Sequence, residues 1–431
     1  MLLLKECKQI LRSIIYFVFI GIVIAFYVTQ FEGYQDDIRA AQNPNAVYDF
    51  RNPLQKPPEG LESYGVKSAE IPEQVVPNAI TALLQEMQGG KFVTYPVGFY
   101  KTVRLNDKEL SKIQDILEEI TGLSYSDLVQ KLMQEEQQKL TMSQDGGWIM
   151  SEPIQIEITS QVSYEQFCEK MGQVDKILGG GSDYAPANLK GFGSESITYE
   201  EALKQFESAK NQDNVTGGYA RLFCDYMGIV LALFSVFIPV SNLMRDRKAD
   251  MLEVIYSRKI SSTRFICIRY IANTIMILLP VLLLSFIPLV SLSVYGAEAH
   301  LSVDYLAFVK YIFAWLLPTV MITVSVGFLF TILTDTPLGI LVGFIWGFLS
   351  LFTGKLSGDY GFRVLIRHNS TIGRDIIDTA MNEIIFNRVF YVVIAIFILL
   401  ISVWIYEKKR RGCIDIGGNL RKILGRIKGT N

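Results

Sequence analysis

Six apolar stretches constrain this chain more than any other feature of its sequence. A helix needs about 20 residues to cross the ~30 Å hydrocarbon core of a bilayer. The stretches are Ser13–Thr29, Tyr219–Leu243, Phe265–Val290, Tyr305–Leu333, Pro337–Phe352 and Val389–Tyr406. The fifth is the shortest, so its ends are the least defined. Because 50% of the 431 residues are hydrophobic, we predict a polytopic α-helical membrane protein with six spans.

A long polar segment, residues 31–218, separates the first two apolar stretches. It carries 29 acidic and 16 basic side chains, whereas the rest of the chain carries 14 acidic and 25 basic ones. Excess Lys and Arg marks cytoplasmic loops, and it occurs in the N-terminal segment, in the loop Met244–Arg264 and in the tail from Lys408. Six crossings place these three segments on one side. We therefore expect both termini in the cytoplasm and residues 31–218 outside the cell.

The first apolar stretch is interpreted as an uncleaved anchor rather than a secretory signal. It follows basic residues, as a signal would, but no small-residue cleavage site follows Val28. The predicted order is thus an N-terminal segment with span one (1–30), the outer domain (31–218), span two (219–243) and a cytoplasmic loop (244–264). Spans three to six (265–406), with an outer loop at 354–388, and a basic cytoplasmic tail (407–431) complete it.

The outer domain is predicted to be mixed α/β. Its only cysteine is Cys168, so no disulfide can form within it, and its hydrophobic core must stabilise it alone. Helical periodicity appears in three groups: Val76, Ile80, Leu83, Leu84 and Met87; Leu110, Ile113, Ile116, Leu117 and Ile120; Phe167, Met171, Val174, Ile177 and Leu178. Strands are expected at Phe92–Tyr95, at Phe99–Leu105 and around Ile154–Ile158. The proline-rich segment Asn43–Pro72 is expected to be an extended lead-in outside the core.

Features that would indicate an enzyme are weak. The glycines of Leu178–Tyr184 lack the following Gly-Lys-Ser/Thr of a phosphate loop, and a turn between helices is the simpler interpretation. The two histidines, His300 and His368, lie far apart in the sequence, and no Cys/His cluster indicates zinc. We expect no catalytic residue, no metal or cofactor bound by this chain, and no nucleic-acid partner.

The basic loop Met244–Arg264 is the most suggestive segment for function. Met251, Leu252, Val254 and Ile255 form a short apolar stripe between basic residues. This pattern fits an amphipathic helix of about two turns. Two interpretations remain open from the residues alone: a helix that grips another protein, or one that rests on the membrane surface with Lys and Arg reaching the headgroups.

The loop resembles a segment of the permease subunits of type-2 ATP-binding-cassette (ABC) exporters. The resemblance rests on Asp246, Asp250, Leu252-Glu253-Val254-Ile255, Ser257-Arg258-Lys259-Ile260-Ser261 and Arg264. It extends to the span order and to the amphipathic stretch Leu2–Arg12, and it covers about 240 residues. The large insertion after the first span is similar to that of Gram-positive members, whereas Arg258 stands where a proline is common.

The resemblance implies a bacterial cell-membrane protein whose inner loop is a coupling helix. The residues expected to couple it to an ATPase are Lys248, Asp250, Met251, Leu252, Glu253, Ile255 and Tyr256. The chain has neither Gly-x-x-x-x-Gly-Lys-Ser/Thr nor Leu-Ser-Gly-Gly-Gln, so ATP and Mg²⁺ would bind a separate cytoplasmic ATPase subunit. A second permease, identical or homologous, would complete the assembly within the membrane lipid.

Polar residues inside spans are expensive and often functional. The candidates are Arg221, Asp225, Asn273 and Lys310. Arg221 and Asp225 stand four residues apart, so they share a helix face and can pair. We expect that pair to be structural.

Export of an amphiphilic substrate (a peptide, lipid or drug), driven by a partner ATPase, is the leading functional hypothesis. The rival is a sensing module, in which the outer domain captures an antimicrobial ligand or a partner and the spans relay a signal. An anchored hydrolase is the weakest alternative, for want of a nucleophile and base.

Overall fold

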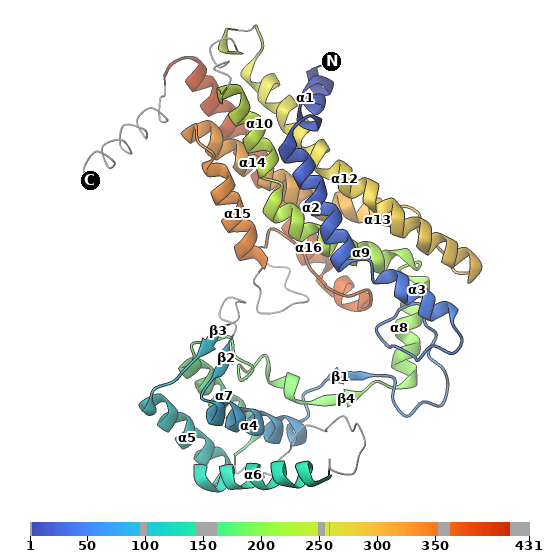
Figure 1. Cartoon of the computed structure of the whole chain (residues 1–431), viewed down its shortest axis with the longest axis vertical. Helices are drawn as coiled ribbons and strands as arrows, with labels where there is room; N and C mark the ends of the chain where they lie inside the picture. The colour runs from blue at the N-terminus through green and yellow to red at the C-terminus, as the bar shows by residue number, and fades with distance from the viewer. Residues whose placement is uncertain are drawn as a thin grey trace. The chain divides into compact units, whose positions relative to one another are not determined.

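The computed structural model describes residues 2–94, 101–142, 162–248, 255–257, 259–351 and 363–413. The chain divides into two compact units (Figure 1). The membrane unit comprises Met1–Pro58, Ala202–Leu351 and Lys355–Asn431, and the polar unit comprises Glu59–Glu201 and Phe352–Gly354. Each unit has a hydrophobic core of its own.

Five helical stretches of the membrane unit are long and apolar enough to cross a membrane: Ile14–Gln42, Thr216–Arg247, Ser262–Glu298, Ala307–Thr334 and Arg374–Arg410. They confirm a multi-pass helical membrane protein. The helices within them are α2 (Ile14–Gln30), α3 (Tyr34–Gln42), α9 (Thr216–Phe234), α10 (Phe237–Lys248), α12 (Ser262–Glu298), α13 (Ala307–Tyr311), the π-helical turn η4 (Ile312–Leu316), α14 (Leu317–Thr334) and α16 (Arg374–Arg410).

The fifth predicted span is the exception. It forms α15 (Leu338–Leu351), whose 14 residues reach only about 21 Å at 1.5 Å per residue. The helix lies close to α9 and α14 through glycines spaced four residues apart. A Cβ at Gly343 would lie 2.8 Å from the Val236 side chain, and one at Gly347 would lie 2.3 Å from the Ala232 carbonyl oxygen. Such small residues let helix backbones approach in a bilayer.

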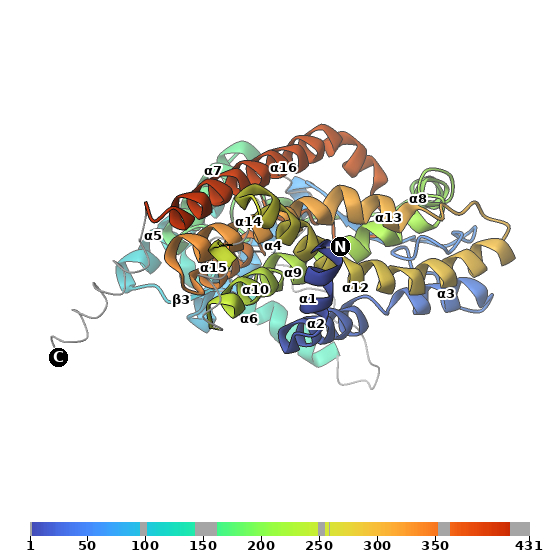
Figure 2. The same ribbon diagram turned by 90° about the horizontal axis from the view of Figure 1, so that it is seen from above.

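Helix α14 lies inside the bundle, whereas α2 and α16 lie at its edge (Figure 2). In the most apolar window of each stretch, 72% of the residues around α14 are buried, against 28% for α2 and 33% for α16. The exposed side chains of the outer helices are apolar, for example Phe17, Val290 and Phe397. An apolar outer surface is what a bilayer requires of a spanning bundle.

Two boundaries of the membrane unit differ from the prediction. Helix α16 begins at Arg374, so much of the predicted outer loop 354–388 is helical. The lead-in expected to be extended is also partly core, because Leu54 is 4% exposed and belongs to the cluster of the membrane unit. The phenolic oxygen of Tyr295 donates to the Leu54 carbonyl at 3.3 Å.

The polar unit is built mainly from helices: α4 (Pro72–Gly89), α5 (Asp107–Thr121), α6 (Tyr125–Met142) and α7 (Tyr164–Leu178), with the 3-10 turn η3 (Leu189–Phe192). The three predicted apolar faces pack together in its core. Strand β1 (Val66–Ser68) pairs antiparallel with β4 (Ser194–Ser196), and β2 (Phe92–Thr94) pairs antiparallel with β3 (Lys101–Val103). The strand expected around Ile154–Ile158 lies outside the described residues. Helix α8 (Tyr199–Asn211) follows in sequence.

Capping explains where several of these helices begin and end. Ser163 and Gln166 form a reciprocal capping box at the start of α7, and Asn106 and Glu109 form another at the start of α5. Helix α7 ends at Gly179, whose φ of 95° lies in the left-handed region that glycine adopts at least cost. The glycine-rich segment is therefore a helix terminator followed by a turn.

The core of the polar unit predicts that residues 59–201 fold by themselves. We expect this fragment, expressed alone, to unfold in one cooperative transition that reductant does not shift, because it contains one cysteine. Near-ultraviolet circular dichroism during chemical denaturation measures this. A fragment without fixed aromatic signals would show that the polar unit needs the rest of the chain to fold.

Glu86 should make the polar unit less stable as the pH rises. Burial raises the pKa of Glu86 above its ordinary 4.5, although Tyr184 and the Val93 N–H donate hydrogen bonds to its carboxyl group. The stabilisation from protonated Glu86 is complete below the unfolded pKa and is lost as the pH rises through the folded pKa. As the pH rises past the unfolded pKa, the free energy of unfolding should therefore fall more in the wild-type fragment than in Glu86→Gln. Parallel profiles for the two proteins would contradict this assignment.

Candidate functional site

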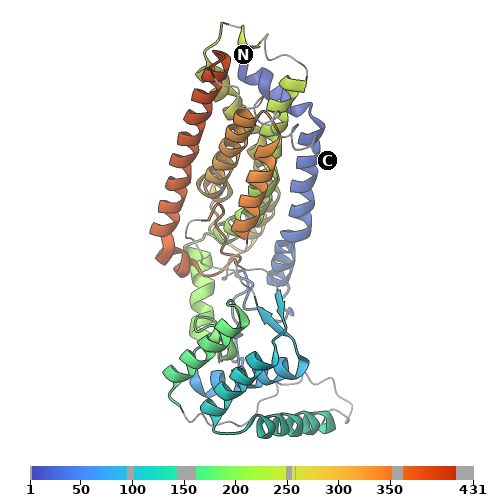
Figure 3. The same ribbon diagram turned by 90° about the vertical axis from the view of Figure 1, so that its left-hand side faces the viewer.

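One end of the membrane unit gathers five segments that are distant in sequence (Figures 1 and 3). They are α1 (Leu2–Leu11), the last turn of α10, the first turns of α12, the turn after α14 and the last turns of α16. Ion pairs join all five, as described below. We call this set the inner joint, and it surrounds the two ends of the basic loop.

Two neighbouring residues of α10 reach in different directions. Successive residues of a helix point about 100° apart, so Asp246 and Arg247 meet different partners. Asp246 forms an ion pair with Arg269 of α12 at 2.5 Å, and Arg269 also pairs with Glu6 of α1 at 3.3 Å. Arg247 pairs with Asp335 in the turn after α14 at 2.6 Å. These pairs tie the end of α10 directly to α12 and to the turn after α14, and through Arg269 to α1.

Asp335 is the second centre of the inner joint. It ends α14 in a left-handed conformation with φ of 58°, which Asp tolerates better than most residues. Its carboxylate also pairs with Lys409 of α16 at 2.7 Å, and its carbonyl oxygen accepts from Arg247 Nη1 at 2.9 Å. One short turn thus holds α10 and α16 together.

The far end of the basic loop is fixed to α16. Arg410 Nε donates to the Tyr256 carbonyl at 2.9 Å, and its Nη1 donates to the Ile260 carbonyl at 2.6 Å. The Tyr256 ring meets Tyr406 edge-on with ring centroids 5.6 Å apart, and Tyr406 stacks on Phe265. Ser262, at the start of α12, donates to Glu407. This end of the loop is therefore attached to both α12 and α16.

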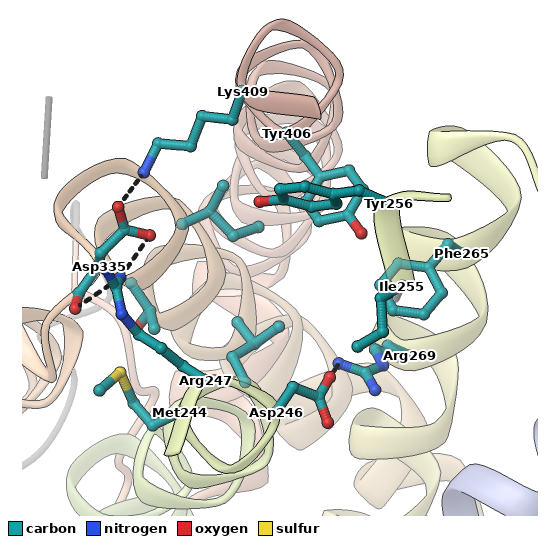
Figure 4. A pocket seen from close by; sticks show the side chains of 13 residues that line it. Met244, Asp246, Arg247, Ile255, Tyr256, Phe265, Arg269, Asp335, Tyr406 and Lys409 are labelled. Carbon is teal, nitrogen blue, oxygen red and sulfur yellow. Dashed lines mark hydrogen bonds and ion pairs between the residues drawn. The ribbon is translucent and has the colours of Figure 1, made fainter. Parts of the chain in front are cut away.

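A small cavity lies at the centre of the inner joint (Figure 4). Asp246, Arg247, Ile255, Tyr256, Arg269 and Asp335 are among the residues that line it. Its volume is about 50 Å³, far below the roughly 300–1,000 Å³ of ligand pockets. The cavity of the inner joint is therefore too small to hold a drug-sized substrate.

The predicted coupling residues divide into two groups. Lys248 is the last residue of α10, and Asp250, Met251, Leu252 and Glu253 lie outside the described residues. Ile255 and Tyr256 line the small cavity, where their side chains face this chain's own helices (Figure 4). The Tyr256 ring contacts Tyr406 of α16 within the chain, and the predicted contact of both residues with an ATPase stays a prediction.

The predicted pairing of Arg221 with Asp225 is wrong. Arg221 is fully buried and makes a two-pronged ion pair with Asp213, with Nη1–Oδ1 and Nη2–Oδ2 distances of 2.5 and 2.6 Å. Asp225 Oδ2 accepts instead from the backbone N–H groups of His368 and Asn369 at 2.7 and 2.6 Å. Asp213 precedes α9, and its side chain reaches back to Arg221 within that helix. Helical spacing alone does not reveal this contact.

The two remaining predicted polar residues have local roles. Asn273 is buried in α12, where its Nδ2 donates to the Arg269 carbonyl at 2.7 Å while its Oδ1 has no hydrogen-bond partner. Lys310 is largely exposed and pairs with Asp304 at 2.7 Å. Neither residue belongs to the inner joint.

Sequence reasoning missed several residues of the inner joint. Arg269 and Lys409 were not among the predicted site residues, although Arg269 interrupts an apolar stretch, which is a recognisable signal. Arg388 was also missed: it is 6% exposed and donates to the carbonyl oxygens of Trp315 and Val364 at 2.9 and 3.1 Å. Within the residues that the structure describes, no three His, Cys, Asp or Glu side chains gather as metal ligands.

In comparisons with known proteins, no protein-family model, no curated protein and no solved structure matches the chain.

Proposed function

We propose that this chain is the permease subunit of an ABC exporter and that its inner joint couples the spans to a separate ATPase. The proposal is supported mainly by the attachment of both ends of the basic loop to the helices of the membrane unit. Arg247 fixes one end to the turn after α14, and the bonds of Arg410 fix the other end to α16. A partner that moves the loop would move α10, α12, α14 and α16 together.

The charge arrangement supports this role. All five segments at the joint contribute an ionised side chain to an ion pair with another segment, and the exposed fractions of these side chains run from 6% for Arg269 to 23% for Arg247. Buried pairs hold one geometry because separating them leaves an uncompensated charge. A sensing module, the rival function, needs few spans and no such joint.

The partners follow from what the chain lacks. Its sequence has no phosphate loop and no Leu-Ser-Gly-Gly-Gln motif, so the proposal assigns ATP and Mg²⁺ to a cytoplasmic ATPase subunit. A second permease, identical or homologous, completes the pathway. The substrate class that suits a bilayer-embedded pathway is an amphiphile, such as a peptide, lipid or drug.

The proposed topology has six crossings, with α15 as the fifth. This arrangement places the inner joint, both termini and the basic loop in the cytoplasm of a bacterial cell, and residues 31–218 outside. Ion pairs join the ends of α1, α10 and α12, and another joins the end of α16 to the turn after α14. Helix ends that are paired in this way must lie on the same side of the membrane, which agrees with six crossings. The excess of Lys and Arg at this end agrees with the rule for cytoplasmic loops.

Cysteine labelling tests this topology. In a background without native cysteines, we expect Ser68→Cys to react with an impermeant reagent on intact cells and Gly417→Cys to react only after lysis. Labelling of Gly417→Cys alone, or of both positions equally, would rule out the topology.

Reconstitution tests transport against sensing. The chain, its ATPase and any second permease would be placed in liposomes, and ATP-dependent movement of a candidate substrate would be measured beside ATPase activity. Transport requires both signals. Stimulated ATP hydrolysis without substrate movement would instead favour the sensing function.

A further inference from the structure

A second cavity lies beside the inner joint, between the α1–α2 junction and α10. Its volume is about 240 Å³, where roughly 10–15 Å³ is enough for one water molecule. Its wall includes Ser13, Ser241, Asn242 and Arg245. It therefore has room for a polyatomic polar group.

Hydrogen-bond donors without acceptors converge on this cavity. Asn242 is 5% exposed, and its buried Nδ2 has no hydrogen-bond partner. Ser13 is the N-cap of α2, but its side chain makes no capping bond. The first N–H groups of a helix lack intrahelical acceptors and carry partial positive charge, and Ile15 of the first turn of α2 lines the cavity.

Arg245 supplies the charge. Its Nη2 donates to Asn242 Oδ1 at 3.0 Å and its Nη1 to the Gln9 carbonyl at 3.3 Å. Among the described residues, no carboxylate pairs with Arg245, whereas Arg247 pairs with one carboxylate and Arg269 with two. The neighbouring carboxylates, Glu6 and Asp246, are already bound to Arg269. An arginine with no carboxylate in direct contact, a buried amide donor and a helix N-terminus together favour an anion.

The surroundings identify the kind of anion. Ile15, which lines the cavity, is exposed. Leu11, Ile14 and Phe17, which lie near it in sequence on α1 and α2, are apolar and exposed as well. Ser13 lies at the start of a membrane-crossing stretch, which is the depth of the headgroups. Basic pockets between spans on the cytoplasmic side bind lipid headgroups.

We propose that this cavity binds the phosphate group of an anionic phospholipid of the inner leaflet. Arg245, Asn242 Nδ2 and the first turn of α2 hold the phosphate, and the acyl chains lie along Ile14 and Phe17. This site does not depend on the ATPase or on the transported substrate.

Native mass spectrometry of the full-length protein tests the proposal. Phosphatidylglycerol would be titrated into detergent-solubilised protein, with phosphatidylcholine in parallel. We expect Arg245→Gln and Asn242→Leu each to weaken phosphatidylglycerol binding by about tenfold, the effect of losing one charged or buried hydrogen bond. Lys5→Gln removes an equal charge from an exposed position on α1 and should bind as the wild type does.

Three outcomes overturn the proposal. The first is unchanged phosphatidylglycerol binding in either cavity variant. The second is equal weakening in Lys5→Gln, which would show attraction by general charge alone. The third is displacement of phosphatidylglycerol by inorganic phosphate at equal concentration, which would identify a site for a free anion.

Discussion

Asp213→Ala is expected to lower the free energy of unfolding of the membrane protein by about 3–5 kcal/mol, because it leaves a buried charge without a partner. The Arg221 and Asp213 side chains are 0% and 3% exposed. Asp213 also pairs with Arg374 at the start of α16 at 3.1 Å. Its loss should therefore loosen the contact between α9 and α16. Reversible unfolding in mixed detergent micelles, followed by tryptophan fluorescence, measures the change.

Two further variants separate this explanation from simple loss of packing. Asp304→Asn is the control, since Asp304 pairs with Lys310, which is 62% exposed, and exposed pairs contribute at most about 1 kcal/mol. Arg221→Leu in the Asp213→Ala background should recover roughly half of the lost stability, because the unpaired charge is gone. If Asp213→Ala lowers the free energy of unfolding no more than Asp304→Asn does, the Arg221–Asp213 pair does not stabilise the protein as assigned.

One variant in the basic loop and one in the turn after α14 should impair transport for different reasons. Leu252→Asp is expected to abolish ATPase binding, since it removes apolar burial worth about 25 cal/mol per Å² and adds a desolvation penalty of several kcal/mol. Asp335→Ala should keep the ATPase bound but reduce transport by at least about tenfold, the equivalent of 1.4 kcal/mol. It leaves Arg247 and the 7% exposed Lys409 without their shared carboxylate. Co-purification and liposome transport distinguish the two defects.

The matched control for the loop is Lys259→Gln, an exposed position of the same segment. We expect near-normal transport from it, since surface charges contribute little. A helix that merely rests on the membrane would give the opposite ranking, with the basic residue mattering most through lipid attraction. Normal coupling in both Leu252→Asp and Asp335→Ala would show that the loop does not transmit movement.

Apolar length and periodicity predicted most of the helices. Five of the six apolar stretches form helices long enough to span a membrane, and the three helical faces of the polar unit pack as expected. These features are local, since burial of one helix face or one whole helix leaves a mark within about 20 residues of sequence. The start of α16 was missed because Arg374–Arg388 is helical without being apolar.

The polar contacts could not be predicted in the same way. Asp225 meets the backbone of His368 and Asn369, which lie 143 and 144 residues away. Arg269 meets Glu6 across 263 residues. Such pairs depend on which helices become neighbours, and residue spacing within one helix does not determine that. Helical spacing therefore suggested the wrong partner for Arg221.

Site-specific photo-crosslinking would show whether the basic loop contacts an ATPase. A photoreactive amino acid at Leu252 in the tagged chain, followed by purification and mass spectrometry, should capture a protein that carries a phosphate loop. The same probe at Lys259 should capture much less of it. If the probe at Leu252 captures lipid alone, with the chain correctly inserted and no ATPase in the purified complex, the basic loop does not contact an ATPase.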